Sequence, residues 1–345
     1  MNILIDIGHP AHVHLFKCFA HEMISRGHKV LFSCRDKEFE IALLEAEGFE
    51  YENFGKKFKT LPGKILGLFK FDLKEYLLGR KFCPDVLLSH GSMYAAHAAK
   101  ILGKPHISFE DTFNMEQIRL YEPFTDIILT GDYEHPKISS KEIHYAGYHE
   151  LAYLHPSRFT PDASVRKELG LKDDEKYVVM RFVSWRATHD AGHKGMTFEN
   201  KLNAVWEMSK YAKVFISSES QLPDALARYK LPTKPERIHD VMAGASLVFG
   251  ESATMVTEGV MLGVPGVYMD NTGRYYTKDL EKNYGMCFNY TESPEDQERA
   301  IEKAVEILSS PQSAEEYRKR HEKLLSEKID VTSFLVETIE NQINK

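Results

Sequence analysis

Cysteine is scarce in this chain, and basic residues are not in excess. Its 345 residues include 4 cysteines, none of them in a Cys-x-x-Cys pair, so the sequence indicates neither a cysteine-based zinc site nor a disulfide framework. The 44 Lys and Arg are outnumbered by 51 Asp and Glu, and the resulting net charge of −7 argues against a general nucleic-acid binder. No apolar run approaches the ~20 residues that a membrane span needs.

The amino-terminal sequence, MNILIDIGHP, also lacks the basic segment and the long apolar segment of a signal peptide. We therefore expect a cytoplasmic protein. The residues that the chain does contain, 43% apolar and 28% charged, are typical of a soluble globular protein. A length of 345 residues exceeds what one ordinary hydrophobic core holds, so we expect two domains.

Short apolar runs alternate with amphipathic stretches, which predicts an α/β fold of parallel sheets covered by helices. The predicted strands are residues 2–7, 29–33, 49–53, 85–89, 106–109 and 126–129, then 177–182, 212–217, 247–250 and 266–269. Residues 1–150 form a first doubly wound, Rossmann-like domain, 151–175 a junction, and 176–345 a second such domain with a helical tail. Two facing domains of this kind bring the carboxyl ends of both sheets to one cleft, where ligands bind.

Residues 250–270, GESATMVTEGVMLGVPGVYMD, predict a strand end, a small-residue turn, a short helix and a second buried strand. The turn exposes backbone N–H groups at the positive end of the helix, and Ser252, Ala253 and Thr254 leave room there for a phosphate. Glu258, inside the helix, is placed to accept hydrogen bonds from both hydroxyls of a ribose. A capped helix with a surface glutamate has the same pattern, so this stretch needs support from elsewhere.

The turn after the first predicted strand carries three histidines within six residues, His9, His12 and His14. A single histidine there would more often be structural, but a cluster at the carboxyl end of a sheet favours a functional role. The spacing His-x-x-His-x-His has no carboxylate beside it and is a poor match to a zinc site. The chain also has no Asp-x-Asp pair. We therefore expect no bound metal.

These motifs resemble those of the GT-B superfamily, and within it the UDP-N-acetylglucosamine 2-epimerases and the lipid-linked N-acetylglucosaminyltransferases of peptidoglycan synthesis. The chain looks most like a prokaryotic domain-of-unknown-function family of this kind. The strongest part of the resemblance is SATMVTEGVMLGVP, which implies that Glu258 is the ribose ligand. In similar proteins the backbone near the position of Ile238, in RIHDVMAGASLVFG, holds the uracil, although a helix entering a strand would look the same.

The resemblance implies further site residues. The AHV of the first turn is similar to the Gly-Gly-His-Val loop of the transferases, which places His12 where a histidine faces the acceptor and the diphosphate. The stretches HISFED and MEQIR are similar to epimerase segments whose glutamates correspond to Glu110 and Glu116 here. The candidate catalytic residues are His12, His14, Glu110 and Glu116. The implied ligands of the nucleotide sugar are Arg181, Ser184, Arg186, His189, Ile238, Ser252, Ala253, Thr254 and Glu258.

Departures from the epimerase pattern rank the possible activities. Epimerases carry an Asp directly after the Gly of the fourth-strand turn, where this chain has Ser92, and a His-Arg pair where it has Trp185 and Arg186. Epimerisation at C2 needs acid–base groups for both the sugar and the diphosphate, whereas inverting transfer needs one base and stabilisation of the diphosphate. We therefore rank first an inverting, metal-independent glycosyltransferase that uses a UDP-sugar in surface polysaccharide or glycoconjugate synthesis. A UDP-N-acetylhexosamine 2-epimerase ranks second, and a non-catalytic nucleotide-sugar binder stays open.

The UDP-sugar is the substrate in this prediction, and no separate cofactor is expected. The acceptor is left open, with a lipid-linked acceptor as one alternative.

Residues 55–82 hold eight Lys or Arg against two acidic residues, with Leu, Ile and Phe between them. Such a segment is suited to the anionic inner face of a membrane. An amphipathic helix that packs on the sheet with solvated lysines has the same composition.

Overall fold

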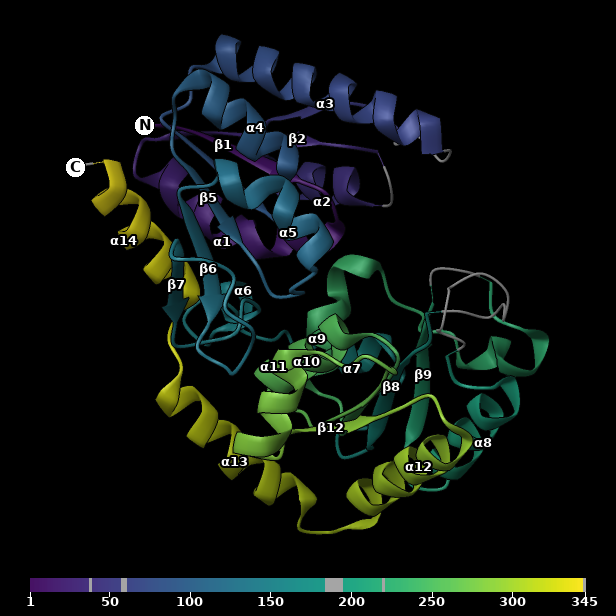
Figure 1. The fold of residues 1–345 in the computed structure, drawn as a ribbon. Coiled ribbons are helices and arrows are strands. Elements are labelled where there is room, and N and C mark those ends of the chain that lie inside the picture. Colours follow the sequence, from purple (N-terminus) through teal and green to yellow (C-terminus); the bar gives the residue numbers. More distant parts are fainter. Residues whose placement is uncertain (37–38, 57–60, 184–194, 219–220, 344–345) are drawn as a thin grey trace. The chain divides into compact units, whose positions relative to one another are not determined.

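The structure is a computed structural model that describes residues 1–36, 39–56, 61–183, 195–218 and 221–343, of which 61–66 and 343 are described by their backbone only. The chain divides into two compact units (Figure 1). The first unit is Met1–Arg158 together with Ile329–Lys345, and the second is Phe159–Lys328. Each unit is built on a parallel sheet with helices around it, which confirms the predicted α/β class.

The sheet of the first unit has seven parallel strands in the order β3-β2-β1-β4-β5-β6-β7. They are β1 Asn2–Ile7, β2 Lys29–Cys34, β3 Tyr51–Asn53, β4 Val86–His90, β5 His106–Phe109, β6 Ile127–Gly131 and β7 Glu142–Tyr145. Consecutive residues of β1, such as Leu4 and Ile5, are fully buried, because a central parallel strand is covered on both faces. Ile5 is in register with Phe32 of β2 on one side and Leu88 of β4 on the other.

Helices lie on both sides of this sheet (Figure 1). They are α1 Pro10–Ser25, α2 Glu40–Ala46, α3 Leu61–Phe82, α4 Met93–Leu102, α5 Met115–Tyr121, α6 Leu151–Leu154 and α14 Val331–Ile343, with a 3₁₀ turn at Glu122–Phe124. Helix α1 starts with Pro10, after His9, whose ring accepts a hydrogen bond from the Ala11 amide and caps the helix. The apolar face predicted for α1, which includes Phe16 and Phe19, is buried.

The second unit has a five-stranded parallel sheet in the order β12-β11-β10-β8-β9. Its strands are β8 Tyr177–Arg181, β9 Lys213–Ser217, β10 Leu247–Gly250, β11 Gly266–Met269 and β12 Cys287–Tyr290. Its α-helices are α7 Val165–Glu168, α8 Phe198–Met208, α9 Ile238–Ala243, α10 Ala253–Met261, α11 Tyr275–Asp279, α12 Pro294–Ser309 and α13 Ser313–Glu327. Short 3₁₀ turns lie at Asp224–Tyr229 and Pro235–Arg237, and a π turn at Leu280–Tyr284.

All ten predicted strands are present, with ends within two residues of those expected. The sequence missed two strands, β7 and β12, and each is the outermost strand of its sheet. An edge strand need not be apolar on both faces, and both are short and mix polar with apolar residues. They therefore lack the continuous apolar run by which the inner strands were recognised.

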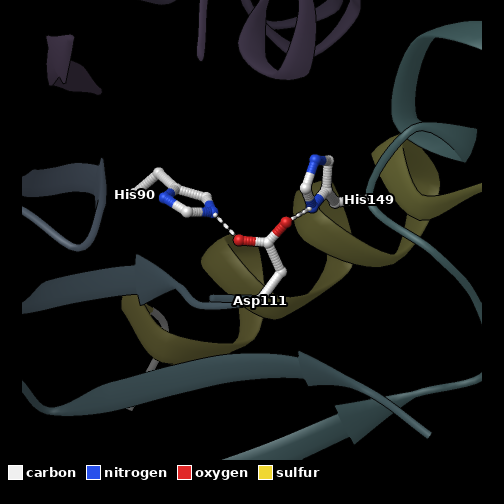
Figure 2. Close-up of side chains that lie close together, drawn as sticks. All are labelled: His90, Asp111 and His149. Carbon is white, nitrogen blue, oxygen red and sulfur yellow. Dashed lines mark ion pairs between the residues drawn. The ribbon is translucent and has the colours of Figure 1, made fainter. Parts of the chain in front are cut away.

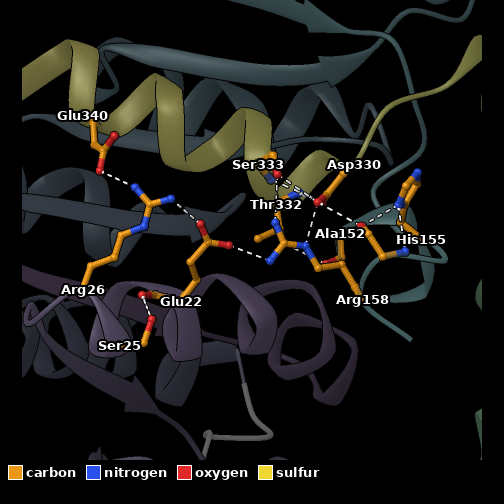
Figure 3. Close-up of polar contacts among 11 residues, drawn as sticks. Glu22, Ser25, Arg26, Ala152, His155, Arg158, Asp330, Thr332, Ser333 and Glu340 are labelled. Atoms are coloured by element: carbon orange, nitrogen blue, oxygen red, sulfur yellow. Dashed lines mark hydrogen bonds and ion pairs between the residues drawn. The ribbon is translucent and has the colours of Figure 1, made fainter. Parts of the chain in front are cut away.

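The helical tail, which the sequence analysis placed entirely in the second domain, is divided between the units. Helix α13 belongs to the second unit, whereas α14 packs on α1 and α6 of the first. Arg158 holds the start of α14 by donating to Asp330 at 2.7 Å and to Ser333 at 2.8 Å, and it donates to Glu22 of α1 at 2.6 Å (Figure 3). The buried apolar residues of α14 are Val331, Leu335, Val336 and Ile339.

Helix α3 contains most of the basic stretch 55–82. Its Phe71 is buried, while Phe69, Leu73 and Leu77 are 67, 56 and 51% exposed. These three exposed residues are spaced by four and therefore share one face of the helix. Within the described parts of the chain, no helix combines the length and the apolar character needed to cross a membrane.

Candidate functional site

The first unit has a topological switch point between β1 and β4. The chain continues from β1 to β2 on one side of the sheet and from β4 to β5 on the other, so the connections that follow β1 and β4 diverge. Ligands of parallel sheets bind in the crevice that such a divergence leaves at the carboxyl edge. His12 follows β1, His90 ends β4, and the centroids of their rings are 4.7 Å apart.

His12 lies in the first turn of α1, where the sequence analysis placed a functional histidine. The Gly8 amide donates to its Nδ1 at 3.3 Å, which leaves the ring proton of the neutral form on Nε2. Burial, together with the nearby His90 and His9, lowers the pKa of His12 well below its ordinary value. At neutral pH the ring is therefore an uncharged group that donates through Nε2.

His90 is part of a cluster that the sequence analysis did not identify. Its Nε2 lies 2.9 Å from Oδ1 of Asp111, and the other carboxylate oxygen of Asp111 lies 3.1 Å from Nδ1 of His149 (Figure 2). Burial alone would lower the pKa of His90, but the charge of Asp111 and its hydrogen bond raise it to about 9. Among the described residues, these three are one of two groups whose donor atoms lie close enough together to share a metal ion.

Glu110 precedes Asp111 and holds the turn in which it lies. Its Oε1 accepts hydrogen bonds from the amides of Asp111, Thr112 and Phe113 at 3.1, 2.8 and 2.9 Å. Its Oε2 accepts one from the hydroxyl of Tyr121 at 2.6 Å, and the residue is 3% exposed. These bonds fix the backbone of Asp111, and a substrate proton would have to compete with them for the carboxylate. The role of Glu110 as a base stays a prediction.

Two other predicted catalytic residues have different surroundings. His14 of α1 stacks on Tyr153 of α6, with ring centroids 5.6 Å apart. Glu116 is exposed in the first turn of α5, a helix that Asn114 caps. Both stay predictions.

A buried ion pair lies beneath the His12 turn. Arg35 donates to both carboxylate oxygens of Asp6, at 2.7 and 3.1 Å, and to the carbonyl of Ile7 at 2.8 Å. Ser92 donates to the same carboxylate and caps α4. The hydroxyl of Ser92 therefore links the end of β4 to Asp6 of β1 at the switch point.

The switch point of the second unit lies between β8 and β10. Gly250, the last residue of β10, has a φ of 151°, and a side chain there would place Cβ 1.9 Å from the carbonyl oxygen of Arg181 on β8. Only glycine fits this close approach. Arg181 itself donates to Ser217 at 3.3 Å. Of the other predicted ligands, Ser184, Arg186 and His189 lie outside the residues that the structure describes.

Helices α9 and α10 bring together the predicted uracil and ribose ligands. Ser252 caps α10 by accepting from the Met255 amide, and Ala253 and Thr254 occupy its first turn, where helix geometry leaves amides without a partner in the helix. Glu258 of α10 is 4% exposed and bonds to Nε2 of His239 at 2.9 Å. His239 directly follows Ile238 at the start of α9.

Some of the site residues that the sequence analysis did not identify could have been found from the sequence, and others could not. His90 and Asp111 stand one and two residues beyond the predicted ends of strands 85–89 and 106–109, at neighbouring places on the carboxyl edge. Their positions after neighbouring predicted strands could have identified both as site residues. His149 follows β7, which was not predicted, and His239 is one residue from the nominated Ile238.

Comparison with known proteins agrees with this architecture. The family "Protein of unknown function (DUF354)" matches residues 1–309, and no curated protein sequence matches the chain. UDP-GlcNAc 2-epimerase from Neisseria meningitidis bound to UDP-GlcNAc is similar in structure, with a TM-score of 0.69 and 14% identity over 99% of this chain and 100% of that one.

Two further solved structures have the same fold. The S. aureus MnaA-UDP co-structure has a TM-score of 0.73 at 12% identity, over 99% of this chain and 97% of that one. MurG from Acinetobacter baumannii has a TM-score of 0.63 at 14% identity, over 99% of each chain. The predicted GT-B-like fold is therefore confirmed.

Proposed function

We propose that this chain, which belongs to the DUF354 family, is an inverting glycosyltransferase that takes its sugar from a UDP-sugar. Its fold is that of sugar-nucleotide enzymes, among them an epimerase solved with UDP-GlcNAc and a protein solved with UDP. The second unit holds the nucleotide in this proposal, and the first supplies the groups that act on the sugar and the acceptor.

The observation that carries the proposal is the pairing of α9 with α10 through His239 and Glu258. This contact places the Glu258 carboxylate, which is suited to bind a ribose, beside Ile238. Glu258 belongs to α10, whose first turn, from Ser252, follows β10 at the switch point of the sheet. A diphosphate at that helix start would be stabilised by the amides of the first turn and by Arg181, without a divalent cation bridging its oxygens.

Transfer is favoured over epimerisation by what surrounds the first-unit crevice. Ser92 stands where the epimerase pattern has an aspartate. The carboxylate that Ser92 contacts is that of Asp6, and Arg35 holds it in an ion pair. Incubation with UDP-N-acetylglucosamine and other UDP-sugars in deuterium oxide separates the two activities. We expect no deuterium at sugar C2 and release of UDP only after an acceptor is added. Deuterium at C2 without an acceptor would identify an epimerase instead, and binding without either reaction a non-catalytic binder.

Glu258→Ala should weaken UDP binding about 10- to 100-fold, because a charged contact to the ribose is worth about 1.5–3 kcal/mol. Isothermal titration with UDP measures the affinity. Glu258→Gln keeps a hydrogen-bonding side chain next to His239 and should bind UDP more weakly than the wild type while unfolding near the same temperature. Glu302→Ala, an exposed glutamate of α12, is the matched control and should bind normally. Wild-type affinity in both Glu258 variants would rule out the ribose assignment.

We further propose that the acceptor is lipid-linked and that α3 meets an anionic membrane surface. Replacing Phe69 and Leu73 together by serine should then reduce binding to anionic phospholipid vesicles at least about tenfold, since each side chain loses on the order of 1.5 kcal/mol of apolar burial. Ile101→Ser, which alters an equally exposed apolar residue on α4, is the control. Vesicle co-sedimentation measures the effect, and equal binding to zwitterionic and anionic vesicles, or none to either, would exclude the membrane contact.

A further inference from the structure

We propose that His90, Asp111 and His149 form a binding site for one borderline divalent cation, with Zn²⁺ as the preferred ion. The three residues come from three separate segments of the first unit: the end of β4, the turn after β5 and the segment after β7. Their donor atoms all lie within 4.8 Å of one another (Figure 2). This site is formed by residues of the first unit alone, whereas the proposed nucleotide site belongs to the second unit, so its occupancy does not depend on the proposed function.

The spacing of the donor atoms suits a metal ion. With metal–ligand distances of about 2.0–2.2 Å, neighbouring ligand atoms of a tetrahedral or octahedral ion stand roughly 3.0–3.5 Å apart. The carboxylate of Asp111 is 2.9 Å from His90 and 3.1 Å from His149. Each histidine nitrogen therefore stands at about the spacing of neighbouring metal ligands from one oxygen of Asp111, and all the donor atoms lie within 4.8 Å of one another.

The surroundings hold the three ligands in place. Their side chains are 11, 8 and 12% exposed, so each is largely enclosed. When Nδ1 of His149 binds the ion, its Nε2 points to Glu150, whose Oε1 lies 3.5 Å away. A carboxylate behind a metal-bound histidine is the usual arrangement in metalloproteins. The backbone of Asp111 is fixed by its hydrogen bond to the Glu110 side chain.

The donor set selects the type of cation. Two imidazole nitrogens and one carboxylate suit Zn²⁺, Fe²⁺ or Co²⁺, whereas Mg²⁺ and Ca²⁺ prefer oxygen ligands throughout. Three protein ligands also leave a coordination position open to water or to a substrate oxygen. His12, whose ring packs on that of His90, lies next to this site.

The sequence predicted no bound metal because the His9–His14 turn has no carboxylate beside it and the chain has no Asp-x-Asp pair. The structure supplies the missing carboxylate from a different strand, as Asp111, and the histidines that contact it are His90 and His149. Neither belongs to the histidine cluster that the sequence displays.

Metal binding is measured on the full chain after chelator treatment, by titration with Co²⁺ followed by its visible absorption and by competition with Zn²⁺. We expect one ion per chain. Asp111→Asn and His149→Gln should each weaken binding at least about 100-fold, and Glu150→Gln about 10- to 100-fold. His97→Gln is the matched control, because His97 also pairs with a carboxylate, Asp72, at 3.1 Å but has no third ligand in its group among the described residues.

Thermal unfolding of each metal-free variant shows whether it is folded, and Zn²⁺ should raise the unfolding temperature of the wild type and of His97→Gln but not that of Asp111→Asn. If the chelated wild type takes up no ion, or if Asp111→Asn binds Co²⁺ as the wild type does, the three residues form a hydrogen-bonded network and the proposal is wrong.

Discussion

His12→Ala should lower the turnover of the transfer reaction about 10²- to 10³-fold and leave the affinity for UDP within about twofold of the wild type. The physical reason is the fixed tautomer of the ring. The Gly8 amide occupies Nδ1, so in the proposed reaction Nε2 would present a proton to the charge that develops on the departing diphosphate or on the sugar. An interaction that forms only as that charge develops affects turnover and not ground-state binding.

A second substitution separates this role from that of a base. His12→Gln offers an N–H donor close to the position of Nε2, and should recover part of the lost turnover if His12 acts as a donor. A base would not be replaced by an amide, so equal loss in His12→Gln and His12→Ala would support the general-base role predicted from the sequence. His28→Ala, at the opposite edge of the sheet, is the control. Full turnover in both His12 variants would remove His12 from the site.

Arg35→Met should lower the free energy of unfolding of the first unit by about 3–5 kcal/mol. Arg35 and Asp6 are 2 and 1% exposed, and the substitution leaves the carboxylate buried without its cation. Glu75, which Ser33 links to Asp6, cannot replace the lost cation because it is itself an acid, and burial together with the charge of Asp6 raises its pKa well above the ordinary range.

Hydrogen exchange in β1 is the appropriate measurement, since both tryptophans of the chain, Trp185 and Trp206, belong to the second unit and their fluorescence does not report on the first. Asp6→Leu combined with Arg35→Met should recover roughly half of the loss or more, because an apolar pair replaces the buried charges. Arg318→Met removes an exposed ion pair of α13 and should have no measurable effect. An equally small effect of Arg35→Met would mean that the Asp6–Arg35 pair adds little to stability.

The inner strands were predictable because burial on both faces leaves a local mark in the sequence. Most of the predicted strands contain buried apolar residues that a parallel sheet encloses, whereas the predicted edge strand β3 is half-buried or exposed. The edge strands β7 and β12 mix polar with apolar residues, so their sequences contain no apolar run from which a strand could be predicted. The placement of α14 was missed for a different reason: its apolar positions predict that it packs on something, but they do not specify which sheet.

Candidate site residues could be predicted from the sequence where they lie within one local motif. His12 and Glu258 stand in motifs that point to a role within a few residues of sequence. The His90–Asp111–His149 cluster depends on the order of three strands, β4, β5 and β7, and only the folded sheet brings their ends together. Glu110 shows the converse: its sequence context suggests catalysis, while its hydrogen bonds hold a turn.

The return of α14 to the first unit determines how the two units can be separated. A fragment ending at Arg158 would contain all seven strands of the first sheet but would leave the surface of α1 and α6 that meets Val331, Leu335 and Ile339 open to water. A soluble first unit therefore needs residues 329–343 as well. They can be joined after Arg158 by a short linker, or placed ahead of Met1 by circular permutation. The second unit, by contrast, is one continuous segment from Phe159 to Lys328 and can be excised directly.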